Sequence, residues 1–415
     1  MESQTKERSE KSRPGWRRTF LALENTNFRW IWLGGLASSV TFQLGMLARG
    51  WLIYDMTGSA LALGWVSSGW GIGILALSLL GGVVADRVRK RNVLVTSQVA
   101  MGLVTLIMGI LIATDLIQVW HLFVGSAAAG VIFAFQMPAN SSLIAEIVDR
   151  ETLLNASSLS SVAMGLTGLV GAPAAGLLLE RIGVAGVYFL QLPLYAFIVF
   201  SLLHLPLTLP SGRKRTSVLQ ELVEGLRYIR ARVVVLILLV VTLARVLLAM
   251  PYQTFLPVFA EDVFATGAWG LGLLQAAVGV GATAGSLGVA SLGDFRRKGG
   301  LLVVAGLALG GSLLLFAYAP SFHLALMALA LVGAAGNVCM VTNSTLLQTN
   351  VSDQVRGRVL SVAMWLWGFS PVGTVPSGAL ADRWGAPLTI ALQGGLLALV
   401  FAAIALGKPY FRYLE

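Results

Sequence analysis

The chain has 415 residues, of which 56% are hydrophobic and only 12% are charged, with a formal net charge of +10. Soluble domains carry about 25% charged residues, so this composition excludes a soluble enzyme, a disordered chain and a nucleic-acid-binding protein. A single cysteine, Cys339, excludes an intrachain disulfide, and three scattered histidines offer little for a metal centre, so we expect no cofactor.

The uncharged stretches of the first half are long enough to cross a membrane. A spanning helix needs about 20 mainly apolar residues. Six stretches between charges meet this length, and they are 30–48, 56–85, 92–114, 116–145, 152–179 and 182–212. The first half therefore predicts six transmembrane helices.

The second half predicts six more spans. The stretch 233–260 is interrupted only by Arg245, and 299–352 is long enough for two helices. We expect those two helices to be separated near Pro320, because proline disfavours helix at the residue before it. The other three spans are 263–293, 359–381 and 384–407. The predicted fold is an all-α integral membrane protein with twelve transmembrane helices.

The basic residues predict the orientation of these spans. With the N-terminus placed in the cytoplasm, 25 of the 29 Lys and Arg residues fall in cytoplasmic segments. Cytoplasmic loops of membrane proteins are enriched in these residues. We therefore expect a multi-pass protein of the cell (inner) membrane with both termini in the cytoplasm.

The expected organisation has two six-helix bundles, each a domain. The segments are a cytoplasmic tail (1–27), an N-terminal bundle (28–207), a linker (208–232), a C-terminal bundle (233–407) and a second tail (408–415). Within the linker, Ser217 to Gln220 forms a capping-box pattern. We expect a short helix on the membrane surface there, which serves either as a tether or in regulation.

The two halves contain matching segments in the same order. The matches pair 63–90 with 271–298, 140–143 with 343–346, and 176–183 with 378–385. Parallel repeats of this kind build transporters with a central site between two moving halves. The repeats therefore predict pseudo-symmetric bundles.

Three motifs resemble those of a known family. Gly82 to Arg91 resembles the loop signature of the major facilitator superfamily, although Arg89 stands where the family has glycine. Gly168 to Gly176 is similar to the glycine-proline signature of its antiporter branch. The segments 57–59 and 256–259 are similar to the drug and siderophore exporters, the branch that includes the bacterial enterobactin exporter.

This resemblance implies a rocker-switch transporter with a cavity lined by spans 1, 4, 7 and 10. Asp86 would latch the outward-facing state by binding a helix N-terminus, or it is only a topology charge. Pro173 would kink a glycine-rich helix, or its surroundings are ordinary packing. The candidate gating residues are Gly82, Asp86, Arg87, Lys90, Arg91, Asp294, Gly171, Pro173 and Gly176.

Two arginines lie inside the predicted spans, whereas every acidic residue lies at or beyond a span end. Arg245 is expected near the midplane, where a charged side chain is costly and by default functional. Arg49 is nearer the outer end, where it could instead extend to the interface. The remaining candidate substrate-binding residues are Gln43, Gln136, Asn140, Tyr252, Gln253, Asn337 and Asn343.

We expect a secondary active exporter of a small amphiphilic molecule such as a siderophore, a drug or a weak acid. No ATP-binding P-loop pattern occurs in the sequence, so an ion gradient must supply the energy, and protons are expected. The acids near the outer mouth, Asp55, Glu261 and Asp262, are the candidate coupling residues. Alternatives are an importer or a lipid-flipping transporter of the same superfamily and, more remotely, a membrane-embedded enzyme. We expect a non-enzymatic, monomeric protein that favours anionic, phenolic or neutral substrates over cations.

Overall fold

The protein is described by a computed structural model that covers residues 21–147, 159, 165, 167–205, 227–292, 295, 297–352, 355–407 and 414, without the side chains of 21, 22, 79–87, 141 and 145. The described residues form helices and contain no strand. Eleven of these helices are long and apolar enough to cross a membrane.

The N-terminal bundle begins with the short helix η1 (Leu21–Glu24) and continues as long apolar helices. Its helices are α3 (Thr26–Thr57), α4 (Ala60–Arg87), α5 (Lys90–Ala113), α6 (Val119–Ile147), the π-helical η2 (Thr167–Gly171) and α8 (Ala172–Leu203). Asn25 starts α3 by accepting hydrogen bonds from the backbone N–H groups of Asn27 and Phe28. The side chain of Asn25 thus caps the N-terminus of span 1.

One glycine explains why eleven helices contain twelve spans. Gly183 lies inside α8 with φ 69° and ψ 176°, a backbone that no α-helix contains. Spans 5 and 6 therefore meet there as two helices. Gly385, with φ 86°, separates α16 (Ser370–Trp384) from α17 (Ala386–Gly407) at the matching position of the second repeat. Both positions need a residue without a Cβ.

The C-terminal bundle repeats this plan. Span 7 comprises α10 (Val233–Ala244), η3 (Arg245–Ala249), α11 (Pro251–Val258) and η4 (Phe259–Val263). Spans 8, 9 and 10 are α12 (Gly267–Ser291), α13 (Lys298–Ala317) and α14 (Phe322–Asn350). Span 11 comprises α15 (Arg356–Trp365), η5 (Leu366–Phe369) and α16. The break predicted at Pro320 falls between α13 and α14. Ser321 caps α14 by accepting from the N–H of Leu324.

Span 7 is irregular because it contains two prolines. Pro251 and Pro257 lack an N–H, so the regular α-helical hydrogen bond is lost at each. Around them the chain widens into π-helical turns, in which Met250 donates to the Arg245 carbonyl (3.0 Å) and Phe264 donates to the Phe259 carbonyl (2.9 Å). Single π-turns occur frequently at functional sites.

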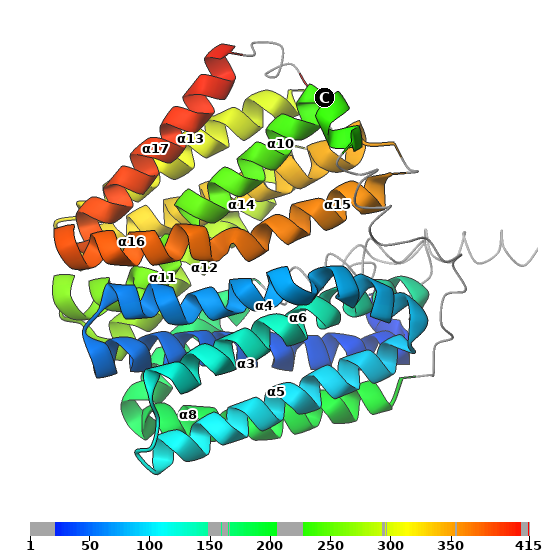
Figure 1. Ribbon diagram of the computed structural model, residues 1–415, viewed down its shortest axis with the longest axis vertical. Helices are drawn as coiled ribbons and strands as arrows, with labels where there is room; N and C mark the ends of the chain where they lie inside the picture. The colour runs from blue at the N-terminus through cyan, green and yellow to red at the C-terminus, as the bar shows by residue number, and fades with distance from the viewer. Residues whose placement is uncertain are drawn as a thin grey trace, which may run out of the picture.

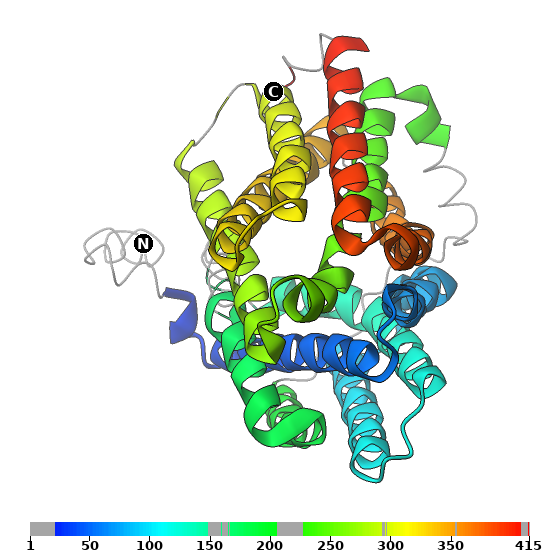
Figure 2. The same ribbon diagram turned by 90° about the vertical axis from the view of Figure 1, so that its left-hand side faces the viewer.

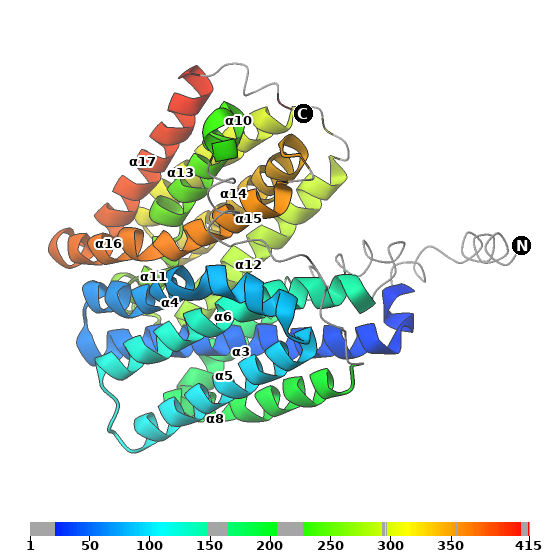
Figure 3. The same cartoon turned by 45° about the vertical axis from the view of Figure 1, so that its right-hand side comes forward.

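The two bundles lie side by side and meet along two pairs of helices (Figure 1). In one pair α4 packs against α16, and in the other α8 packs against α12. These are spans 2 with 11 and 5 with 8, as a two-fold relation between the halves requires. Figures 2 and 3 show the same separation into an N-terminal and a C-terminal group of helices from two further directions.

Small residues allow the bundles to approach. A Cβ built on Gly64 would lie 2.5 Å from the carbonyl oxygen of Thr374 across the α4–α16 contact. On the bundle surfaces, large apolar side chains are exposed, among them Leu399 at 66%. A soluble protein rarely exposes such surface, whereas a membrane protein turns it toward lipid.

Candidate functional site

A cavity of about 1850 Å³ lies between the two bundles. Its lining extends from Trp30, Leu202 and Arg358, at the end where the basic loops lie, up to Ile53 and Leu63. We call that end the inner end, and the opposite end, with the α3–α4 and α16–α17 turns, the outer end. The cavity therefore reaches the inner end and stops below the outer one.

Six of the nine predicted substrate-binding residues line this cavity. They are Gln43, Arg49, Gln136, Asn140, Arg245 and Gln253. They come from spans 1, 4 and 7, three of the four spans in which we expected them.

Three predicted members lie elsewhere. Tyr252 is buried, and its hydroxyl accepts from the amide nitrogen of the neighbouring Gln253 at 3.3 Å. Asn343 is buried and donates to the hydroxyl of Thr242 at 2.9 Å, which ties span 10 to span 7. Asn337 accepts from Ser286 at 2.9 Å. These three side chains form their hydrogen bonds within the C-terminal bundle and do not line the cavity.

Arg245 carries an unsatisfied charge into the cavity wall. It is the first residue of the π-helical η3, and its Nε atom is buried without a hydrogen-bond partner. Among the described residues it forms no ion pair, and the described lining contains no carboxylate. Arg245 is half-buried, and a partly desolvated guanidinium without a counter-ion is favoured when a ligand supplies an anion.

Two further arginines add positive charge at other depths. Arg49 is half-buried in the cavity wall, and its charge acts on the hydroxyls of Tyr188 and Tyr195, which also line the cavity. Arg358 lies at the inner mouth. Arg245 and Arg49 therefore place positive charge at two depths of the described cavity wall.

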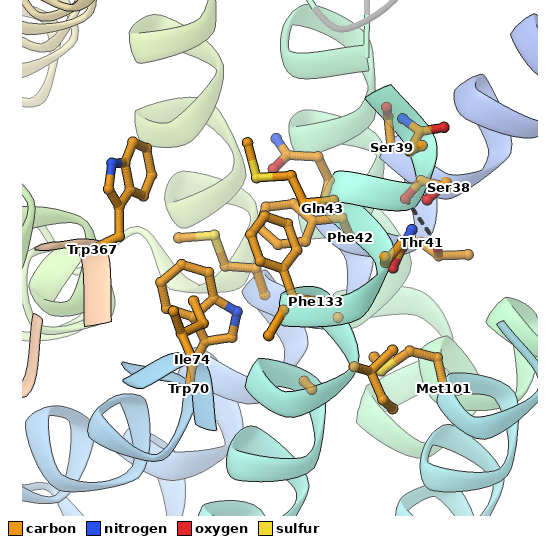
Figure 4. Close-up of a pocket in the computed structure, with 18 of the residues that line it drawn as sticks. Ser38, Ser39, Thr41, Phe42, Gln43, Trp70, Ile74, Met101, Phe133 and Trp367 are labelled. Carbon is orange, nitrogen blue, oxygen red and sulfur yellow. Dashed lines mark hydrogen bonds between the residues drawn. The ribbon is translucent and has the colours of Figure 1, made fainter. Parts of the chain in front are cut away.

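The rest of the cavity wall is largely apolar and polarizable. Seven of the eleven methionines line it, together with Phe42, Trp70, Phe133 and Trp367. Figure 4 shows Trp70, Ile74 and Phe133 beside Gln43 and the hydroxyl side chains of α3, with Trp367 opposite them. The Trp70 and Phe133 rings lie 5.5 Å apart. Methionine and aromatic surfaces adapt to varied apolar ligands.

The outer end is closed by contacts between the bundles. The Tyr54 hydroxyl of α3 donates to the carboxylate of Asp262 in η4. Of the three acids predicted as coupling residues, Asp262 makes this contact, whereas the structure shows no cross-bundle hydrogen bond from Asp55 or Glu261 to another described residue. Slightly deeper, Gly50 packs against the ring of Pro257.

Two of the predicted gating residues act within one bundle. Lys90 is buried at the start of α5 and forms an ion pair with Glu146 at the end of α6. Arg91 donates to the carbonyl of Leu205, at 2.7 Å, beyond the end of α8. Both basic residues tie spans 3, 4 and 6 together. The structure does not describe the surroundings of Gly82 or the side chains of Asp86 and Arg87. Asp294 lies outside the described residues.

The glycine-proline segment of span 5 faces span 8. A Cβ on Gly176 would lie 2.6 Å from the carbonyl oxygen of Ala268, and Pro173 follows the π-helical η2 at the start of α8. A Cβ on Gly171 would meet only the methyl group of Thr167 in its own segment, at 3.3 Å. Gly171 therefore does not make the close contact with span 8 that Gly176 makes.

Comparison with known proteins agrees with this arrangement. The model of the family described as transmembrane secretion effectors matches residues 18–412. The multidrug efflux pump Tap of Mycolicibacterium fortuitum is 25% identical, over 93% of this chain and 96% of that protein. The enterobactin exporter EntS of Shigella boydii is 27% identical, over 91% and 87%. The crystal structure of the nucleoside transporter NupG superposes with a TM-score of 0.71 at 15% identity, over 92% of this chain and 99% of that one.

The twelve spans, the cavity between two bundles and these relatives define a multi-pass membrane transporter rather than an enzyme. The chain belongs to the transmembrane secretion effector family of the major facilitator superfamily.

Proposed function

We propose that the protein is a secondary active exporter of a small amphiphilic molecule whose polar part is anionic, phenolic or neutral. The observation that carries this proposal is the cavity wall, which presents Arg245 and Arg49 and no carboxylate among the described residues. Efflux as the direction of transport is supported by the two relatives, a multidrug efflux pump and an enterobactin exporter.

The cavity favours a substrate with two chemically distinct parts. Opposite charges 4 Å apart attract by about 4 kcal/mol at an effective dielectric of 20, before desolvation is subtracted, and a cation is repelled by a comparable amount. The methionine and aromatic side chains supply the complementary apolar surface. An aromatic or aliphatic acid, a phenolic siderophore or a neutral drug fits both parts.

The state of the two ends supports alternating access. The cavity reaches the inner end, while contacts such as that between Tyr54 and Asp262 close the outer end, and this arrangement supports an inward-facing state. The protein would then rock between this state and an outward-facing one as a monomer.

Proton coupling is the proposed source of energy, and Asp262 is the best placed of the three candidate acids. Its hydrogen bond to Tyr54 crosses the interface between the bundles, so opening the outer end changes its surroundings. Asp55 and Glu261, like Asp262, are exposed at the same end.

Cysteine labelling tests the proposed orientation. With Cys339 replaced by alanine, we expect Leu116→Cys to react with a membrane-impermeant maleimide added outside intact cells. Ala231→Cys should react only after the membrane is opened. Both positions are exposed. Leu116 lies in the turn after α5, at the outer end, and Ala231 lies just before α10, at the inner end. The opposite labelling pattern would contradict the assignment of the inner and outer ends.

The charge preference is tested in cells that express the protein. We expect expression to lower the accumulation of a fluorescent aromatic acid and to leave a quaternary ammonium dye unaffected, because the described cavity wall repels permanent cations. A vector-only strain is the control. Export of the cation with no export of the acid would overturn the proposed substrate class, and increased accumulation of the acid would indicate an importer.

A further inference from the structure

Two carboxylates at the outer end bind helix N-termini in the opposite bundle. Asp382, near the end of α16, accepts hydrogen bonds from the Ser59 hydroxyl (2.7 Å) and from the N–H groups of Ala60 (2.7 Å) and Leu61 (3.2 Å) at the start of α4. Glu180, in α8, accepts from the N–H of Trp269 (3.0 Å) at the start of α12. The first N–H groups of a helix have no partner within it, and the helix dipole there favours an anion.

The two contacts are equivalent in the two repeats. The match between 176–183 and 378–385 aligns Glu180 with Asp382, and each is followed three residues later by a glycine with positive φ. An acid therefore binds a helix N-terminus of the opposite bundle at each of the two main helix pairs where the bundles meet.

These contacts depend on closure of the outer end. Thr266, at the N-cap of α12, makes no side-chain capping hydrogen bond, so the N–H of Trp269 relies on Glu180 from the other bundle. Beside the carboxylates the backbones are in close contact: a Cβ on Gly378 would lie 2.6 Å from the carbonyl oxygen of Ala60. When the bundles separate at this end, both carboxylates must exchange their helix N–H groups for water.

We propose that Asp382 and Glu180 form a two-point latch that holds the outer end closed and biases the empty transporter toward its inward-facing state. The inference rests on the proposed alternating-access function. Asp382, with three donors, is the stronger point, and Glu180, with one, is the weaker. Neither residue lines the cavity, so both act as positioning residues.

The distance between the bundles at the outer end tests the latch. Spin labels at Trp120→Cys and Tyr318→Cys, in a Cys339→Ala background, report this distance by pulsed electron paramagnetic resonance in lipid nanodiscs. Asp382→Asn keeps the shape of the side chain and removes its charge. We expect it to raise the ratio of outward-open to inward-open molecules about tenfold, which corresponds to about 1.4 kcal/mol. Glu180→Gln should raise this ratio about threefold, and the double variant by more than either alone.

Asp115→Asn is the matched control. Asp115 is an exposed acid in the outer turn after α5, within one bundle, at a φ of 54° that asparagine tolerates. The control should leave the distances unchanged. If Asp382→Asn does not fold, Ser59→Ala removes one donor to Asp382 and should shift the distances in the same direction.

Unchanged distance distributions in the folded single and double variants would overturn the latch. The measurement uses neither substrate nor ion gradient, so this result would leave the export proposal standing. Conversely, a shift in distance without any export in cells would retain the latch and refute the proposed direction or substrate.

Discussion

Replacing Arg245 with alanine should reduce the transport of an acidic substrate roughly ten- to a hundredfold, which is the factor expected when a charge-assisted hydrogen bond of about 1.5–3 kcal/mol is lost. The guanidinium lines the cavity, its Nε atom has no protein partner, and no described residue neutralises it. A substrate carboxylate or phenolate would supply the missing acceptor. The measurement is initial efflux rate against substrate concentration in cells with matched expression.

Two other arginine variants separate binding from folding. Arg245→Lys should restore only part of the flux, because lysine keeps the charge but lacks the planar bidentate fork. Arg49→Ala should have a smaller effect, because Arg49 lies nearer the outer end of its helix and its charge also acts on Tyr188 and Tyr195. If Arg245→Ala transports the acid as well as the wild type does, Arg245 is structural and the charge argument fails.

Replacing Gly176 with leucine should abolish transport while the protein is still inserted. A Cβ at this position already lies 2.6 Å from the Ala268 carbonyl oxygen, and it would also lie 3.2 Å from the Cα of Gly272. Helices in lipid pack closely only where such small residues meet. The leucine side chain would force α8 and α12 apart and prevent the outer end from closing. Efflux and the amount of inserted protein would be measured together.

Gly311→Leu provides the matched control for this substitution. Gly311 is also inside a membrane-spanning helix, but a Cβ there would meet no atom within 4 Å. The variant should transport normally. Normal transport by Gly176→Leu, or an equal loss in both variants, would show that the contact between spans 5 and 8 is not required for the cycle.

Much of the fold follows from the positions of charges and glycines. The gaps between charged residues predicted twelve spans, and described helices lie in all of them, with spans 5 and 6 meeting at the kink at Gly183. Hydrophobic length determines whether a helix can cross a membrane, and charge is excluded from its interior. These properties are local, so the sequence reveals them directly.

Which side chains line the cavity was harder to predict, because this depends on the rotation of each helix about its axis. Tyr252 and Gln253 are neighbours in sequence, yet Gln253 lines the cavity and Tyr252 does not. Successive residues point about 100° apart on a helix with 3.6 residues per turn. Helices other than spans 1, 4, 7 and 10 also line the cavity, through residues such as Gln98, Gln191 and Trp367.

The outer contacts show what only the folded chain reveals. The sequence marked Glu180 and Asp382 as equivalent by their repeat, but both looked like ordinary acids at span ends. Their partners at the N-termini of α12 and α4 are backbone N–H groups, which nearly every residue type carries, so the residue types do not indicate these contacts.

The most direct test of the account is substrate flux in proteoliposomes that contain only the purified protein. A labelled aromatic acid is placed on the side of the membrane that corresponds to the cytoplasm, and a proton gradient is imposed with the opposite side acidic. We predict that the acid moves to the acidic side against its own concentration gradient, that a protonophore stops this movement, and that Arg245→Ala abolishes most of it. Movement that ignores the proton gradient, or an equal rate for a permanent cation, would contradict a proton-driven exporter with an electropositive cavity.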